Sequence, residues 1–95
     1  MKEREEMERP LGVGSVVYSN AGRDEGRYYM VYEILDDTFV TIVDGNLRKM
    51  SKPKKKKLKH LKNYGDVLEN IAEKLKEGKK VYDAEIFSAL RKYNS

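Results

Sequence analysis

The residues of this chain that could do chemistry are mostly cations, and many of them gather in one short stretch. Residues 51–62 read SKPKKKKLKHLK, which contains seven lysines and no acidic residue. The whole chain has a formal charge of only +4, so this stretch carries more than the entire positive surplus. Lysine ammonium groups bind phosphates as point charges, and such a concentration favours a polyanionic partner. A solvated surface without a ligand is the alternative interpretation.

Groups suited to catalysis are few. The chain has one histidine, His60, and no cysteine, which excludes a Cys/His pair and argues against a zinc site. The spacings GxSxG, HExxH and that of a phosphate-binding P-loop are absent. Asp36 and Asp37 are adjacent acids between two expected strands, where such residues usually form turns. We therefore expect a binding protein, with no enzymatic activity and no cofactor.

Strands are expected to position the cations. Residues 1–10 have mixed charge and no apolar period, so we expect a flexible leader there, with a short helix as the alternative. Three β-rich runs follow, GSVVYS, RYYMVYEI and TFVTIV, each bounded by turn-forming residues. A tight turn at DGN should lead into a short fourth strand, LRKM. This spacing is typical of a small antiparallel barrel or meander.

The lysine run has the pattern of a strand. Pro53 interrupts the chain because it cannot donate a ladder hydrogen bond, and the extended run Lys56 to Lys62 follows. Alternation places Leu58 and His60 on one face of that run and the neighbouring lysines on the other. A polybasic tail would have no reason to contain leucines, so we expect a basic edge that the fold holds in place.

Two short amphipathic helices are expected after Gly65. Asp66 is a suitable N-cap with Glu69 as its capping-box partner, Gly78 ends this helix, and Asp83 begins the second. The apolar stripes are Val67, Leu68, Ile71 and Leu75 in the first helix and Ile86, Phe87, Leu90 and Tyr93 in the second. Such helices are not stable alone, so their stripes should pack on the β-structure, with a partner protein as the alternative.

The loop between the first two expected strands adds two arginines, in the run Gly22-Arg23-Asp24-Glu25-Gly26-Arg27. This loop resembles the KOW family, a small RNA-binding motif of large-subunit ribosomal proteins and transcription elongation factors, whose loop has the form G-K/R-D-x-G-K/R. The sequence departs from many KOW motifs at residues 28–30, YYM, where they carry another glycine. The variant is similar to archaeal and eukaryotic large-subunit proteins of the fourteen-e class, whose last strand is similar to the run that ends in residues 59–61, KHL.

The resemblance covers residues 13–62 and implies a five-stranded SH3-like barrel with RNA as the ligand. We therefore expect a mainly β protein with a leader at 1–10, a barrel at 11–63 and a helical hairpin at 64–95 that packs on the barrel. The expected partner is ribosomal RNA of the large subunit, bound by a ribosome-associated protein that acts in translation. A KOW protein-interaction module of a transcription or translation factor, contacting its partner through the C-terminal helices, is the alternative.

The expected RNA contacts lie in both basic segments: Asn20, Arg23, Arg27, Arg48, Lys49, Lys52, Lys54, Lys55, Lys56, Lys57, Lys59 and His60. Lysines would supply affinity for phosphates, whereas the planar forks of Arg23 and Arg27 would fix orientation. The chain also has seven tyrosines, which can stack on bases. Most should lie in the barrel wall, and Tyr18 and Tyr64, next to the loop and the basic strand, are the two to test.

The location expected for this protein is the cytoplasm. The first ten residues lack the apolar region of a secretory signal, and nowhere do eighteen apolar residues run together. The absence of cysteine fits a reducing compartment. A cationic patch for a membrane surface would need a basic amphipathic helix, which the chain lacks, so we expect no membrane partner.

Overall fold

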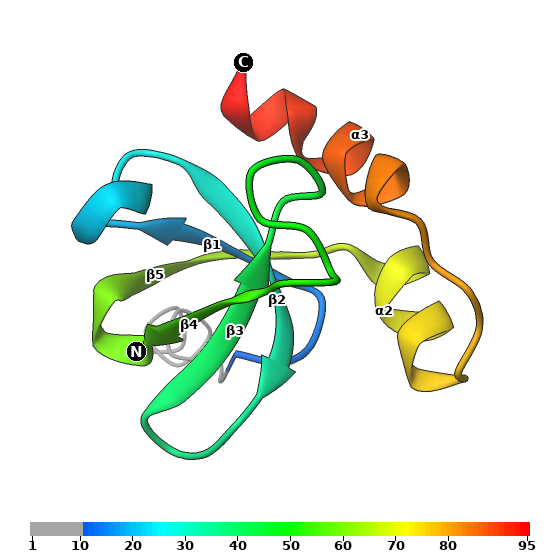
Figure 1. The fold of residues 1–95 in the computed structure, drawn as a ribbon, viewed down its shortest axis with the longest axis horizontal. Helices are drawn as coiled ribbons and strands as arrows, with labels where there is room; N and C mark the ends of the chain where they lie inside the picture. The colour runs from blue at the N-terminus through cyan, green and yellow to red at the C-terminus, as the bar shows by residue number, and fades with distance from the viewer. Residues whose placement is uncertain (1–10) are drawn as a thin grey trace, which may run out of the picture.

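A computed structural model describes residues 11–95, and the leader expected at 1–10 lies outside them (Figure 1). The described elements, in chain order, are β1 (Ser15–Ser19), the 3-10 turn η1 (Gly22–Asp24), β2 (Tyr28–Ile34), β3 (Phe39–Val43), β4 (Lys54–Lys57), the 3-10 turn η2 (Leu58–His60), β5 (Leu61–Val67), α2 (Glu69–Lys76) and α3 (Asp83–Asn94). The predicted class, mainly β with a helical appendage, is therefore confirmed.

The five strands form one antiparallel sheet in the order β4-β3-β2-β1-β5. Irregular register between Val31 and Glu33 marks a bulge that bends β2 where it pairs with β3. The sheet curls, and η2 joins its two edge strands, β4 and β5 (Figure 1). Backbone hydrogen bonds attach η2 on both sides, from Leu58 N–H to the Thr38 oxygen and from Asn20 N–H to the His60 oxygen.

The two faces of the sheet are buried in different cores, as alternation along a strand requires. One core lies on the face of the sheet that is turned away from the helices, and it is made of Val17, Tyr29, Val31, Val40, Ile42 and Leu61. The other lies between the sheet and the helices and is made of Val16, Met30, Val43, Ile71, Val81, Ile86 and Leu90. Most of the predicted helical stripes pack on the sheet, and each fully buried aliphatic side chain contributes about 1.5 to 3 kcal/mol. The prediction was wrong for Val67, which ends β5, and for Phe87, because both side chains are exposed.

The fourth strand lies later than the sequence predicted. The LRKM run belongs to a loop, and β3 pairs instead with the four lysines of β4. Asp44 Oδ1 accepts hydrogen bonds from the backbone N–H groups of Asn46 and Arg48. An aspartate that accepts local backbone bonds competes with a strand ladder, so the chain makes a wide loop before it can return.

The extended run predicted at 56–62 is divided by η2, and β5 continues past residue 63 to Val67 because it pairs with β1 along this length. Asp66 was predicted as the N-cap of the first helix, but it lies in β5. Leu68 takes the N-cap position of α2 instead. Gly78, with a φ of 74°, ends α2, and Asp83 begins α3, both as predicted. Neither helix described in residues 11–95 is long and apolar enough to cross a membrane.

Candidate nucleic-acid interface

Asp24, in the loop that resembles the KOW motif, is a buried anion that two basic side chains and a tyrosine contact. Only 4% of its surface is exposed. Its Oδ1 accepts hydrogen bonds from Arg48 Nε at 3.0 Å and from the Tyr29 hydroxyl at 3.1 Å. Its Oδ2 lies 3.6 Å from Lys56 Nζ. One carboxylate thus joins η1 to β2, to the loop between β3 and β4, and to β4 itself.

The surroundings of Asp24 keep it ionised. Burial raises its pKa, but the hydrogen bond and charge of Arg48, with smaller contributions from Tyr29 and Lys56, outweigh burial and leave the pKa below its ordinary value. Burial, followed by the nearby Asp24 charge, raises the pKa of Tyr29 to about 12, so its hydroxyl stays a donor. Part of the positive charge of the basic segments is therefore neutralised within the fold.

Lys56 differs from the other lysines of β4 because its side chain points inward. It is 7% exposed, and its ammonium group donates to the Ala21 carbonyl oxygen at 2.8 Å. Lys55 and Lys57, one residue away on either side, are exposed. Lys56 was predicted to contact RNA. In this position it instead holds β4 against η1, because its ammonium group contacts the Ala21 carbonyl oxygen and the Asp24 carboxylate inside the protein.

Five of the predicted cations gather around the loop between β3 and β4. A shallow hollow of about 550 Å³ is lined by Asn46, Leu47, Arg48, Lys49, Ser51, Lys52, Pro53, Lys54 and Lys55. Five of these residues are cations that the sequence predicted as RNA contacts, and none is acidic. A hollow with such a lining can hold phosphate groups from several directions.

The C-terminal helix α3 holds this loop in place. Asp83, the first residue of α3, accepts a hydrogen bond from the Met50 backbone N–H at 2.9 Å. Gly45 has a φ of 80°, and a Cβ there would lie 2.1 Å from the Asp83 carbonyl oxygen and 2.8 Å from Phe87 N. Only glycine fits so close to the helix backbone. The loop thus lies directly against α3, beside which Figure 1 shows it.

The two arginines of the η1 loop lie in different surroundings. Arg23 is exposed, as a tip residue that reaches phosphates should be. Arg27 is half-buried, and its Nη2 lies 3.8 Å from Oδ2 of the buried Asp44. Gly26 has the left-handed φ, 90°, that the motif predicted for it. The loop therefore presents Arg23 outward and uses Arg27 partly as an internal contact.

The remaining predicted contacts surround these elements. Lys55 Nζ lies 4.4 Å from the centre of the Phe39 ring, which fixes its position over β3 by a cation–π contact. Lys57, Lys59 and Asn20 are exposed, and His60 is half-buried.

Four tyrosines meet where the strands β1, β2 and β5 approach the end of α3: Tyr18, Tyr28, Tyr64 and Tyr93. Sequence reasoning singled out Tyr18 and Tyr64 but missed their two partners. Strand register pairs Tyr18 with Tyr28, but residues 20–27, which include the 3-10 turn η1, separate the two strands, and a connection of this length does not fix the register from the sequence. The contact of Tyr93 with the other rings depends on how α3 packs against the sheet, which no local pattern in the sequence encodes.

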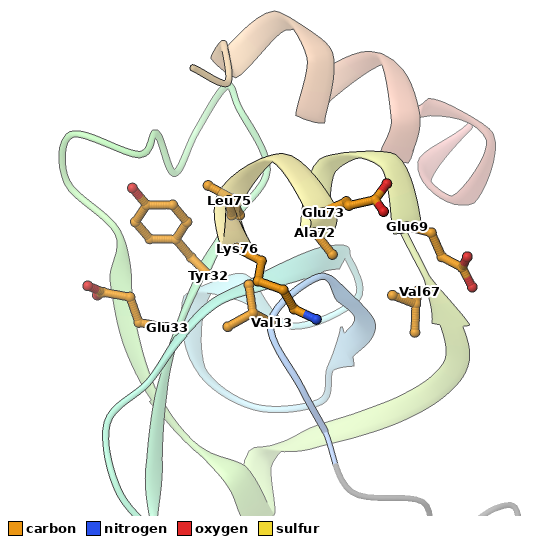
Figure 2. A pocket seen from close by; sticks show the side chains of 9 residues that line it. All are labelled: Val13, Tyr32, Glu33, Val67, Glu69, Ala72, Glu73, Leu75 and Lys76. Atoms are coloured by element: carbon orange, nitrogen blue, oxygen red, sulfur yellow. The ribbon is translucent and has the colours of Figure 1, made fainter. Parts of the chain in front are cut away.

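A larger groove, of about 690 Å³, lies between α2 and the sheet and has the opposite character. It is lined by Val13, Tyr32, Glu33, Val67, Glu69, Ala72, Glu73, Leu75 and Lys76. Figure 2 shows Glu33 and Glu69 on opposite sides of the apolar side chains of Val13 and Ala72. Its lining contains three carboxylates and one ammonium group, so the groove has a negative charge that repels phosphates. It does not belong to a nucleic-acid surface.

Comparison of the chain with models of protein families found no match, and comparison with curated proteins found none. Within residues 11–95 there is also no group of three or more His, Asp or Glu side chains that could hold a metal ion.

Proposed function

We propose that this protein binds structured RNA through its cationic surface, which we define as the exposed or half-exposed residues Arg23, Arg48, Lys49, Lys52, Lys54, Lys55, Lys57 and Lys59. The observation that carries this proposal is the hollow in which five cations and no acid line the loop between β3 and β4. Asp24 connects that loop to η1 through Arg48, so Arg23 is held on the same framework. Preorganised cations bind phosphates without the entropic cost of ordering a tail.

We further propose that the RNA is ribosomal RNA of the large subunit and that the protein acts in translation as a ribosome-associated factor in the cytoplasm. The resemblance of residues 22–27 to the KOW loop supports this choice, as does the concentration of charge in residues 51–62. In this proposal the curled sheet is an SH3-like barrel that spans 11–63 and the helices of 64–95 support it. The protein binds and does not catalyse.

Two kinds of contact share the work in this proposal. Lysines of the hollow bind phosphates with little demand on geometry and supply affinity. The logarithm of the binding constant should fall with the logarithm of the salt concentration at a slope of roughly 0.7 to 0.9 per phosphate neutralised. Arg23, with a planar fork at an exposed turn, fixes orientation and supplies selectivity among RNAs.

The experiment that tests the proposal measures affinity for a large-subunit ribosomal RNA fragment over a series of salt concentrations. A triple variant, Lys49→Gln, Lys52→Gln and Lys54→Gln, should weaken binding by about tenfold or more and reduce the salt slope by about 2 to 3. The matched control is Lys76→Gln, Lys79→Gln and Lys80→Gln, which removes the same charge from the end of α2 and the segment between α2 and α3. Equal losses for both triples would show that only net charge matters and would overturn the assignment of the surface.

Sedimentation of a cell lysate through sucrose tests the ribosomal partner separately. The protein should migrate with large ribosomal subunits at low salt and leave them as salt rises, because phosphate contacts weaken with ionic strength. Migration with other RNA particles, or none with ribosomes at low salt, would refute the ribosomal assignment while leaving RNA binding to be judged by the affinity measurements.

A second candidate function is contact with another protein, and the groove of Figure 2 favours it. Its apolar lining and three carboxylates fit a partner segment that carries both apolar and basic side chains. Under this reading, the double variant Glu33→Lys and Glu73→Lys should abolish an association that persists at high salt, such as one with polymerase, and should leave RNA affinity intact. Unchanged association would remove this candidate.

A further inference from the structure

The four tyrosines form a continuous cluster whose rings touch at aromatic distances. Tyr18 and Tyr28 are cross-strand partners on β1 and β2, with ring centroids 5.0 Å apart. Tyr64 of β5 lies 5.4 Å from Tyr28 in an edge-to-face arrangement. Tyr93 of α3 contacts both Tyr28, at 5.8 Å, and Tyr64, at 5.3 Å. Four rings brought together from three strands and one helix form a fixed aromatic platform.

Hydrogen bonds hold this platform in place. The Asn94 side chain accepts from the Tyr28 backbone N–H at 2.8 Å and donates to the Tyr28 carbonyl oxygen at 3.1 Å, which fastens the end of α3 to β2. The Tyr93 hydroxyl donates to Asp66 Oδ2 of β5. Two independent links therefore join α3 to the sheet at this point, so the rings are positioned before any ligand arrives.

An open hollow of about 360 Å³ adjoins the rings. It is lined by Tyr18, Tyr28, Lys62, Asn63 and Tyr64. Tyr64 is 52% exposed although it makes two ring contacts, so a large part of its surface faces solvent at the hollow. The hollow lies within the size range of small-ligand sites, and a planar group fits beside exposed rings.

The charge beside the hollow is positive. Lys62 is exposed and lies directly opposite Tyr18 across the β1–β5 pair. Lys92 Nζ lies 5.3 Å from the centre of the Tyr93 ring. The neighbouring carboxylate, Asp66, accepts the Tyr93 hydroxyl. A planar group attached to a phosphate would thus meet rings and ammonium groups together.

We propose that this tyrosine pocket, made of Tyr18, Tyr28, Tyr64 and Lys62, receives one unpaired nucleobase of the bound RNA. The base stacks on the exposed Tyr64 ring, and Lys62 holds the adjoining phosphate. The inference rests on the proposed RNA binding and names the element recognised, a nucleotide turned out of a helix. Arg27 directly precedes Tyr28 and its carbonyl accepts from Ser19 N–H, so the pocket adjoins the η1 loop of the proposed RNA-binding region.

Three hairpin RNAs test this inference: one with a single bulged 2-aminopurine, a fully paired counterpart, and a counterpart with an abasic bulge. Binding should quench the fluorescence of the 2-aminopurine, and the protein should favour the bulged hairpin over the other two. Tyr64→Leu should weaken binding to the bulged hairpin by about tenfold and leave the other two unchanged, because only stacking is lost. Tyr64→Phe should retain the preference, since the ring remains.

Tyr82→Leu is the matched control, because Tyr82 is 59% exposed and lies outside the cluster. Equal affinity for the three hairpins, or Tyr64→Leu acting no differently from Tyr82→Leu, would overturn the pocket. The proposed function fails in a distinguishable way. In that case no hairpin is bound in a manner that depends on Lys49, Lys52 and Lys54, whereas failure of the pocket alone leaves that dependence intact.

Discussion

The ammonium group of Lys56 lies 3.6 Å from the buried carboxylate of Asp24. Lys56 comes from the middle of the lysine run and Asp24 from the loop that resembles the KOW motif, so this ion pair joins the two segments on which the functional proposal depends. A buried pair is costly to form but more costly to break on one side, because a single charge is left without compensation. The pair therefore matters more for how the cationic surface is shaped than for its total charge.

Replacement of Lys56 by methionine should destabilise the fold by about 2 kcal/mol, because Asp24 keeps Arg48 but loses a second cation. Urea unfolding measures this loss. Lys57→Met is the matched control, since Lys57 is exposed on the same strand, and it should change stability by less than about 0.5 kcal/mol. Equal effects at the two positions would mean that the inward position of Lys56 has no energetic role.

Acid should remove the stabilisation that Asp24 provides. Its pKa in the folded state lies below the ordinary value of 3.8, so the folded state favours the ionised form. This contribution is fully present above the pKa of the unfolded chain and is lost as pH falls through the lower, folded value. Asp24→Asn should therefore be less stable than the natural protein at neutral pH, and the difference should shrink below about pH 4.

The measurement for Asp24 is the free energy of unfolding at several pH values. Glu25→Gln, a charge change at an exposed neighbouring position, is the control. A difference between Asp24→Asn and the natural protein that stayed constant from pH 7 to about pH 2 would contradict ionic stabilisation.

Gly45→Ala should destabilise the protein far more than Gly26→Ala. Both glycines have positive φ, at 80° and 90°, so both substitutions cost about 1 kcal/mol of backbone strain. At Gly45 the new methyl group would also lie 2.1 Å from the Asp83 carbonyl oxygen, whereas at Gly26 no atom lies within 4 Å. We expect Gly45→Ala to cost several kcal/mol in thermal or urea unfolding and also to loosen the cationic loop. Similar losses would show that α3 does not press on the loop.

Arg23→Ala should reduce affinity for the cognate RNA more than affinity for random RNA of the same length, because an exposed arginine fork supplies orientation. Removal of loop lysines should weaken binding to both RNAs alike. Arg27→Ala was expected to act like Arg23→Ala, but its contact with buried Asp44 adds a loss of stability that unfolding experiments will detect. If Arg23→Ala and the lysine variants each lost the same affinity for cognate and random RNA, the separate roles of the arginine and the lysines would be contradicted.

Much of the local structure could be predicted because its signals are local. β-rich runs bounded by turn-forming residues place β1, β2 and β3, and the helical stripes that end at Gly78 and begin at Asp83 place α2 and α3. The failed fourth strand has a local cause as well, since Asp44 binds the backbone of its own loop. Here a side chain that competes with the ladder outweighed the strand propensity of the residues after it.

The sequence by itself determined where the charge lies along the chain, which segments are β-rich, and that two amphipathic helices need a surface to cover. Only the tertiary structure decided which lysine turns inward to Asp24, that the basic loop is fastened to α3, and that Tyr28 and Tyr93 join Tyr18 and Tyr64. The physical reason is that periodicity and propensity act over a few neighbouring residues. The direction and partner of a polar or aromatic side chain depend instead on strand register and helix packing between segments far apart in the chain.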